Sequence, residues 1–212
     1  MSDLDIVILA AGKGSRMKSA LPKVMHEIGG KPMINHVIDT ARKLSPREIF
    51  VIYGDSGEYV KNRLQAPDLT FIEQKEQLGT GHAVLAAAPN LIDFDGVALI
   101  MFADTPLVTA DTLNHLASSI DATTSVAVLG FETAEPHGYG RLITDNGGQL
   151  TRIVEDSDAN ESEKRITLAN GGIMAVRCPL LFDLIKQVDG ILSEKTDIKP
   201  IIGFEFNNEE CI

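Results

Sequence analysis

The chain has 212 residues, of which 44% are hydrophobic and 5% aromatic. This suits one sizeable aliphatic α/β core, and the formal net charge of −11 argues against nucleic acid as a partner. No apolar stretch is long enough to cross a membrane, and no signal-like segment opens the chain. Cys178 and Cys211 do not have a metal-binding spacing. We therefore expect a cytoplasmic protein that binds neither membranes nor nucleic acid.

Strand and helix signals alternate through the first two thirds of the sequence. Residues 6–9 form a continuous apolar run, which is typical of a buried parallel strand. After Lys31-Pro32, apolar residues recur at helical spacing up to Leu44. The pattern further predicts strands at 49–53, 69–72, 97–102 and 125–130, and helices at 59–64, 80–88 and 110–120. This alternation predicts an α/β fold with a Rossmann-like, doubly wound, mixed but mostly parallel sheet.

From about residue 138 the pattern changes. Residues 141–144 and 149–154 flank Asp145-Asn146-Gly147-Gly148, which is a hairpin turn signal. A further strand is expected at 172–176 and a helix at 179–187. This part is predicted to be a small antiparallel subregion, and because no linker precedes it, residues 1–212 are expected to form a single domain.

The loop after the first predicted strand is basic, although the whole chain is acidic. Between Ile6 and His26 there is no acidic residue, and two glycines lie among Lys13, Arg16, Lys18 and Lys23. Glycines let backbone N–H groups surround an anion, and the cations add directional hydrogen bonds. The spacing is not that of a P-loop, and the third glycine of a Rossmann fingerprint is replaced by Met17. A phosphate site and a tight turn with solvated lysines both remain open on this element alone.

The longer pattern is more specific. Leu9–Met17 (LAAGKGSRM) followed by Leu21–Lys23 (LPK) resembles the signature of the sugar-phosphate nucleotidylyltransferases, and in particular the uridylyltransferase domain of the bacterial bifunctional enzymes that make UDP-N-acetylglucosamine. Further segments match in the same order, namely 74–82, 103–107, 138–141, 153–155 and 170–173. The similarity covers about residues 4–198 and implies the nucleotide-diphospho-sugar transferase type of fold. It divides the chain into a nucleotide-binding part (about 1–135), a sugar-binding part (about 136–200) and a diverged tail (201–212). No hexapeptide repeat is visible, so no acetyltransferase part is expected in this sequence.

The resemblance implies two catalytic cations. Arg16 matches the family's triphosphate-binding arginine, and Lys23 matches the lysine near the reacting phosphates. Nucleotide binding is implied for Leu9, Ala10, Ala11, Gly12, Gln74, Gly79 and Thr80. A glutamine amide can donate and accept at once, which suits the imide edge of uracil. Gly79–Gly81 is also a plain helix start, and His82 is expected to be a helix-face residue and not a ligand.

Asp104 follows a buried strand, where a carboxylate suits a Mg²⁺ ligand. Its alternative role is that of a turn or capping residue before Pro106. The family has glycine in place of Ala103, and we expect the extra methyl to crowd the nucleotide. The family's second protein ligand for Mg²⁺ is not recognisable, and Asn207 and Asn208 are the candidates for it.

On the sugar side, the resemblance implies that Gly140, Glu155 and Asn170 bind the sugar. The glutamate would bind sugar hydroxyls, and the other two would hold an N-acetyl group. A solvated glutamate is the alternative. The family has threonine after this asparagine, whereas this chain has Gly171.

Three functions follow from these motifs. The first is a Mg²⁺-dependent transfer from UTP to N-acetylglucosamine 1-phosphate, which gives UDP-N-acetylglucosamine and diphosphate. The second keeps the reaction but uses another sugar 1-phosphate or nucleoside triphosphate. The third is a non-catalytic protein that binds nucleotide sugars. Turnover distinguishes the third from the others, and the sequence leaves the oligomeric state open.

Overall fold

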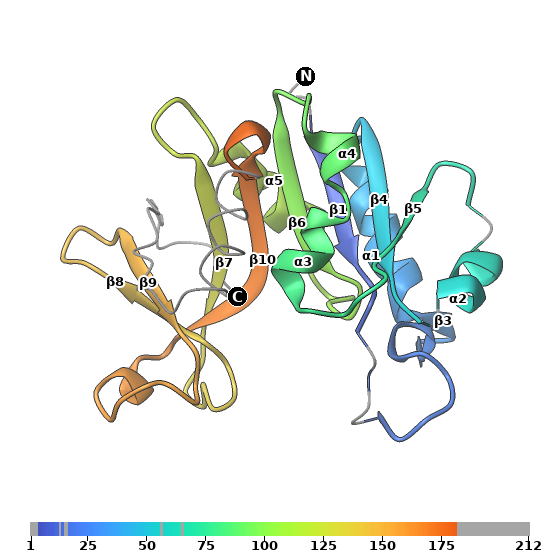
Figure 1. The fold of residues 1–212 in the computed structure, drawn as a ribbon. Coiled ribbons are helices and arrows are strands. Elements are labelled where there is room, and N and C mark those ends of the chain that lie inside the picture. Colours follow the sequence, from blue (N-terminus) through green and yellow to red (C-terminus); the bar gives the residue numbers. More distant parts are fainter. Residues whose placement is uncertain (1–3, 13, 15–16, 56, 65, 182–212) are drawn as a thin grey trace.

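The computed structural model describes residues 4–12, 14, 17–55, 57–64 and 66–181. Its centre is an eight-stranded mixed sheet (Figure 1). The strands are β1 (Leu4–Leu9), β4 (Glu48–Tyr53), β5 (Thr70–Glu73), β6 (Val97–Phe102), β7 (Val126–Glu132), β8 (Arg141–Thr144), β9 (Leu150–Val154) and β10 (Leu168–Arg177). Their order is β5-β4-β1-β6-β10-β8-β9, and β7 also pairs with β10.

The sheet has a parallel and an antiparallel part. Strands β5, β4, β1 and β6 are parallel, so their carboxyl ends lie at one edge. Strand β10 runs antiparallel to β6, β7 and β8, and β8 and β9 form a hairpin. The long β10 therefore joins the β8–β9 hairpin to the parallel strands, and Figure 1 shows that hairpin on the far side of the molecule from β5.

Helices cover both faces of the parallel part, because the strand residues alternate between two apolar layers. On one face, Ile6 and Ile8 pack in a core with residues of α1 (Met33–Lys43) and α5 (Ala110–Ser118). On the other face, Val7 and Leu9 pack with residues of α3 (Thr80–Leu85) and α4 (Ala88–Leu91). This is the three-layer arrangement of a doubly wound fold, with the sheet between two layers of helices. The remaining short elements with described bounds are α2 (Gly57–Leu64), a β2–β3 ribbon (Glu27–Ile28 and Lys31–Pro32) and two 3₁₀ turns (Lys23–Met25 and Glu163–Arg165).

The structure confirms the predicted mixed α/β fold and the antiparallel subregion. One predicted element is wrong in extent: the helix expected at 80–88 is divided into α3 and α4. Pro89 has no N–H to donate to the carbonyl of Leu85, and Ala87 N–H donates to Val84 in a tighter turn instead. The β2–β3 ribbon was not predicted. Residues 178–181 are helical, and the rest of the helix expected at 179–187 lies outside the described residues.

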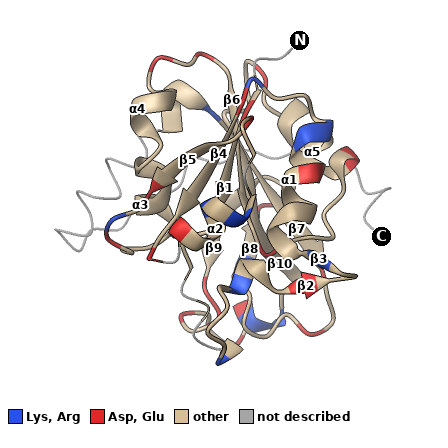
Figure 2. Cartoon of the chain, turned by 90° about the vertical axis from the view of Figure 1, so that its right-hand side faces the viewer, with Lys and Arg blue, Asp and Glu red and all other residues tan. Residues whose placement is uncertain are grey.

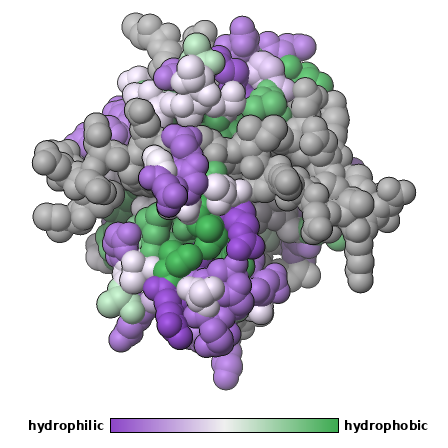
Figure 3. Space-filling model, turned by 90° about the vertical axis from the view of Figure 1, so that its left-hand side faces the viewer, coloured by the Kyte–Doolittle hydropathy of each residue, from purple (hydrophilic) through white to green (hydrophobic). Residues whose placement is uncertain are grey.

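Charged and apolar residues occupy different parts of the molecule. In Figure 2 the charged residues lie mainly on helices and connecting loops, while the central strands carry few of them. Figure 3 shows the opposite side, where apolar side chains gather near the middle of the view, bordered by hydrophilic ones, and again towards the upper right. Among the described residues, no helix is both long and apolar enough to span a membrane.

Candidate active site

A cleft of about 590 Å³ lies at the carboxyl edge of the parallel strands. Backbone hydrogen bonds join the segments that follow the strands. The N–H of Ala10 donates to Ile52 O (2.8 Å), and the N–H of Ala103 donates to Leu9 O (3.0 Å). Gln74 N–H is held in the same way by Tyr53 O (2.7 Å). The ends of β1, β4, β5 and β6 are therefore fixed around one opening, which is where open α/β sheets bind ligands.

The structure brings the predicted nucleotide-side residues together in this cleft. Its lining includes the backbone-rich segment 9–12 after β1 and the segment around Gln74, Gly79 and Thr80 between β5 and α3. Lys23 and Asp104 line it as well. The role of these residues in binding stays a prediction, and Arg16, the other predicted catalytic residue, lies outside the described residues.

Lys23 is positioned by a close approach of two loop segments. Its ammonium forms an ion pair with the Oδ2 atom of Asp104, and both side chains are about one-third exposed. Gly14 passes so near to Lys23 that a β-carbon at position 14 would lie 2.6 Å from Lys23 Cβ. Gly14 also has a φ of +57°, which L-residues rarely adopt. The glycine is therefore required by the backbone and by the lysine that packs on it.

We expect Gly14→Ala to destabilise the protein by about 1–2 kcal/mol from the left-handed backbone alone, with a further cost from displacing Lys23. The free energy of unfolding in urea measures this. Gly12→Ala is the matched control, because a β-carbon at Gly12 meets no atom within 4 Å and its φ is not positive. The control should change stability by less than about 0.5 kcal/mol. Equal effects of the two changes would contradict this account of the loop.

Asp104 follows β6 and faces the cleft. Mg²⁺ is bound in proteins through one or two carboxylates, with water and substrate phosphates completing an octahedron. The described residues contain no cluster of three or more acidic, histidine or cysteine side chains that could hold a metal by themselves. A single accessible carboxylate beside a cleft of about 590 Å³ fits a metal that arrives with a nucleotide, provided that Lys23 releases Asp104. Asn207 and Asn208 lie outside the described residues.

The expectation that Ala103 crowds the nucleotide is wrong. Ala103 is fully buried in the core of the α1 and α5 face, and it does not line the cleft. Its methyl group therefore faces the protein interior and not the ligand space.

Gln74 is buried, with 4% of its surface exposed. Its amide nitrogen donates to Gly79 O (3.2 Å) and contacts Nδ1 of His82 (3.1 Å). The nitrogen is therefore engaged within the protein, which leaves the amide oxygen for a base, and the role of Gln74 in reading the base stays a prediction. His82 lies on α3, as expected of a helix-face residue, and its contact with Gln74 was not predicted.

Sequence reasoning assigned no role to Gln77, which also lines the cleft. A β-carbon on Gly54 would lie 2.4 Å from the amide nitrogen of Gln77, so the side chain of Gln77 occupies space that only a glycine at position 54 leaves open. Its buried Oε1 atom has no hydrogen-bond partner in the described structure. Phe102 was missed too, although its place at the end of β6, two residues before Asp104, was a usable signal.

The three predicted sugar-side residues form a second cluster. Asn170 N–H donates to Gly140 O (2.8 Å), and a β-carbon on Gly140 would lie 3.4 Å from Oε1 of Glu155. Asn170 Oδ1 accepts from the N–H of Gly172 (2.8 Å), where β10 is irregular. Gly172 has a φ of +76°, and a β-carbon on it would lie 2.6 Å from the ring of Phe102, so the ring packs directly against the glycine. Because Phe102 lines the cleft, the sugar-side cluster adjoins it.

Gly171, which replaces the family's threonine, has a physical reason in this chain. A β-carbon at position 171 would lie 2.8 Å from the carbonyl oxygen of Leu129. A threonine would have to displace the backbone of β7, so the close contact between β7 and this irregular part of β10 requires a glycine.

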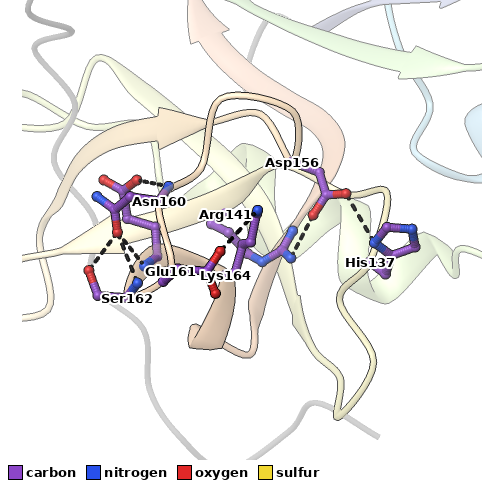
Figure 4. A network of polar contacts seen from close by, with 8 residues as sticks. His137, Arg141, Asp156, Asn160, Glu161, Ser162 and Lys164 are labelled. Carbon is purple, nitrogen blue, oxygen red and sulfur yellow. Dashed lines mark hydrogen bonds and ion pairs between the residues drawn. The ribbon is translucent and has the colours of Figure 1, made fainter.

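A buried arginine forms hydrogen bonds with two of the segments that carry the sugar-side cluster (Figure 4). Arg141 is 2% exposed and donates to the carbonyl of Tyr139 and to Asp156 Oδ1 (2.9 Å). Asp156 Oδ2 also lies 3.2 Å from Nδ1 of His137. A hydrogen bond from the Gly138 backbone, followed by those from Arg141, lowers the pKa of the Asp156 carboxyl. Arg141 thus links Tyr139, which precedes Gly140, to Asp156, which follows Glu155.

This arrangement defines the class of the protein. An open α/β sheet with a cleft of about 590 Å³ at its carboxyl edge, and a polar cluster beside it on an antiparallel lobe, is the layout of a nucleotidyltransferase. The chain belongs to the MobA-like NTP transferase domain family, whose sequence model matches residues 6–166.

Known proteins with similar sequences support this assignment. The bifunctional protein GlmU of Herminiimonas arsenicoxydans is 51% identical over 171 residues, which is 81% of this chain and 37% of that protein. GlmU of Idiomarina loihiensis is 45% identical over 206 residues, or 95% and 45% of the respective chains. The chain therefore spans less than half the length of these relatives.

A solved structure confirms the fold. A candidate glucose-1-phosphate thymidylyltransferase from Bacillus anthracis, in complex with a sucrose, superposes with a TM-score of 0.72. The match covers 92% of this chain and 80% of that one, at 18% sequence identity.

Proposed function

We propose that this chain transfers a uridylyl group from UTP to N-acetylglucosamine 1-phosphate, giving UDP-N-acetylglucosamine and diphosphate. The observation that carries the proposal is the single cleft in which the loop after β1, Gln74, Gly79, Lys23 and Asp104 meet. The adjoining cluster of Gly140, Glu155 and Asn170 supplies polar groups for a sugar. The similarity of 45–51% to GlmU proteins favours these substrates over other pairs.

The reaction is a displacement at phosphorus. An oxygen of the sugar 1-phosphate forms a bond to the α-phosphorus of UTP, and the bond from that phosphorus to the bridging oxygen of diphosphate breaks. A phosphate nucleophile is already ionised near neutral pH, so the step needs no strong general base. Positioning and electrostatic stabilisation supply most of the catalysis in such transfers.

Each described part of the site has a role in this scheme. The backbone after β1 holds the triphosphate, and the segment of Gln74 and Gly79 holds the base. Lys23 neutralises charge at the reacting phosphates once it leaves Asp104. Glu155 and Asn170 orient the sugar so that its phosphate faces the α-phosphorus. Arg16 is proposed to bind the triphosphate on the ground of the sequence motif alone.

Mg²⁺ is the proposed cofactor, and Asp104 is the residue that would hold it. When bound, the metal offsets negative charge on the phosphates as diphosphate leaves. The described structure fits this role because Asp104 is accessible and its Oδ1 atom is not used by Lys23.

The test is diphosphate release with purified protein, Mg²⁺, each of the four nucleoside triphosphates and a panel of sugar 1-phosphates. We expect turnover with UTP that depends on both Mg²⁺ and N-acetylglucosamine 1-phosphate. Turnover with a different pair would replace these substrates but keep the reaction. Binding of UTP with no turnover under saturating Mg²⁺ would contradict the enzyme and favour a nucleotide-sugar binding protein.

A further inference from the structure

We propose that His82 is a positioning residue that fixes the orientation of the Gln74 amide and thereby selects pyrimidine bases with an N3–H group. The inference rests on the proposed nucleotide site and adds a residue and a mechanism for base choice. Three observations carry it: the burial of Gln74, its two internal contacts, and its place in the lining of the cleft.

The contact with Gly79 shows which amide atom is the nitrogen, and the contact with His82 adds a second partner that holds it. A backbone carbonyl can only accept a hydrogen bond, so the Gln74 atom 3.2 Å from Gly79 O must be the NH₂ nitrogen. In the flipped amide two carbonyl oxygens would face each other in a buried place, which is unfavourable. The orientation therefore follows from the chemistry of the partner.

The contact with His82 uses the second hydrogen of the same nitrogen. An amide NH₂ has two hydrogens and accepts none, so Nδ1 of His82, at 3.1 Å, must be the acceptor. The imidazole then carries its proton on Nε2. Both hydrogens of Gln74 are thus satisfied inside the protein, one by the loop before α3 and one by the first turns of α3.

What remains for a ligand is the amide oxygen. Gln74 lines the cleft, and its Oε1 atom has no hydrogen-bond partner among the described residues. A fixed acceptor suits N3–H of uracil, which is a donor. N3 of cytosine is itself an acceptor, so the same pose would set two lone pairs against each other. Sites that hydrogen-bond their substrate reject such analogues strongly, because polar groups are left unpaired.

His82 then has a role beyond filling space, because it holds the Gln74 amide in one orientation. Without an acceptor at position 82, one amide hydrogen loses its partner, and only the contact with Gly79 O still opposes a turn of the nitrogen toward the cleft. That nitrogen is a donor, which suits N3 of cytosine. The loss of His82 should therefore change the ratio between two nucleotides, and not only the overall affinity.

The experiment compares His82→Leu, which removes the acceptor, with His82→Asn, whose side-chain oxygen restores one. His115→Ala is the matched control, because His115 is exposed on α5 and outside the cleft. Dissociation constants for UTP and CTP are measured by calorimetry without sugar phosphate. We expect His82→Leu to lower the UTP preference at least about tenfold. His82→Asn should keep most of the preference, and the control should keep all of it.

Several results would overturn the inference. One is an equal loss of UTP and CTP affinity in His82→Leu at an unchanged ratio, since that would mark a merely structural role. Others are an unchanged ratio with unchanged affinities, and a native protein that binds both nucleotides equally. Because binding is measured apart from diphosphate release, a protein that selects UTP but does not turn over would contradict the proposed reaction and leave the role of His82 supported. Thermal unfolding of each variant checks that it folds.

Discussion

Lys23→Ala is expected to lower turnover by about 10²–10³, which corresponds to the loss of about 2.7–4 kcal/mol of transition-state stabilisation. The ammonium of Lys23 lies in the cleft within reach of Asp104, and Gly14 packs against its side chain so that it enters from a fixed direction. A preorganised cation of this kind acts where negative charge develops on the phosphates. The measurement is kcat for diphosphate release at saturating substrates.

The same change should affect the fold little. The ion pair of Lys23 with Asp104 is about one-third exposed on each side, and exposed pairs are worth about 0–1 kcal/mol. Lys43→Ala is the matched control, because Lys43 is exposed at the end of α1 and outside the cleft. Near-normal kcat in Lys23→Ala, or an equal loss in the control, would show that the loop after β1 is not the phosphate site.

The sequence was sufficient to predict most of the fold, because burial patterns differ between the two parts of the sheet. Residues 6–9 of β1 and the whole of β6 are continuous apolar runs, which is typical of strands buried on both faces, and helices do cover both faces there. The hairpin of β8 and β9 was recognisable from its turn residues. Periodicity alone did not predict the break between α3 and α4, since a run of alanines continues through it and only Pro89 interrupts the hydrogen bonding.

The site was predictable where motifs specify single residues, and less so where neighbours determine what a residue can do. The lining of the cleft by Gly12, Gln74 and Asp104 agrees with the motif positions. The direction of the Gln74 amide depends on Gly79 O and His82, and the place of the Ala103 methyl depends on the core behind it. Such effects come from contacts in three dimensions, which a pattern along the chain does not contain.

The metal role of Asp104 can be separated from its pairing with Lys23. If the carboxylate only held the lysine, removing its charge would change kcat without changing how the reaction depends on Mg²⁺. If it binds the metal, the half-saturating Mg²⁺ concentration must rise, because one of the few protein ligands is weakened. The Mg²⁺ dependence therefore decides between the two roles, whereas the loss of activity does not.

Asp104→Asn is accordingly expected to abolish measurable turnover at millimolar Mg²⁺, with partial recovery at high Mg²⁺ or with Mn²⁺. The asparagine keeps the shape of the side chain and one oxygen ligand but loses the charge that attracts the cation. The measurement is diphosphate release across a Mg²⁺ titration, and Asp111→Asn, on the exposed side of α5, is the matched control. A reduced rate with the native Mg²⁺ dependence would mean that Asp104 acts through Lys23 alone. A near-normal rate would remove Asp104 from the site altogether, and the metal, if one is needed, would then be held by the nucleotide and by other residues.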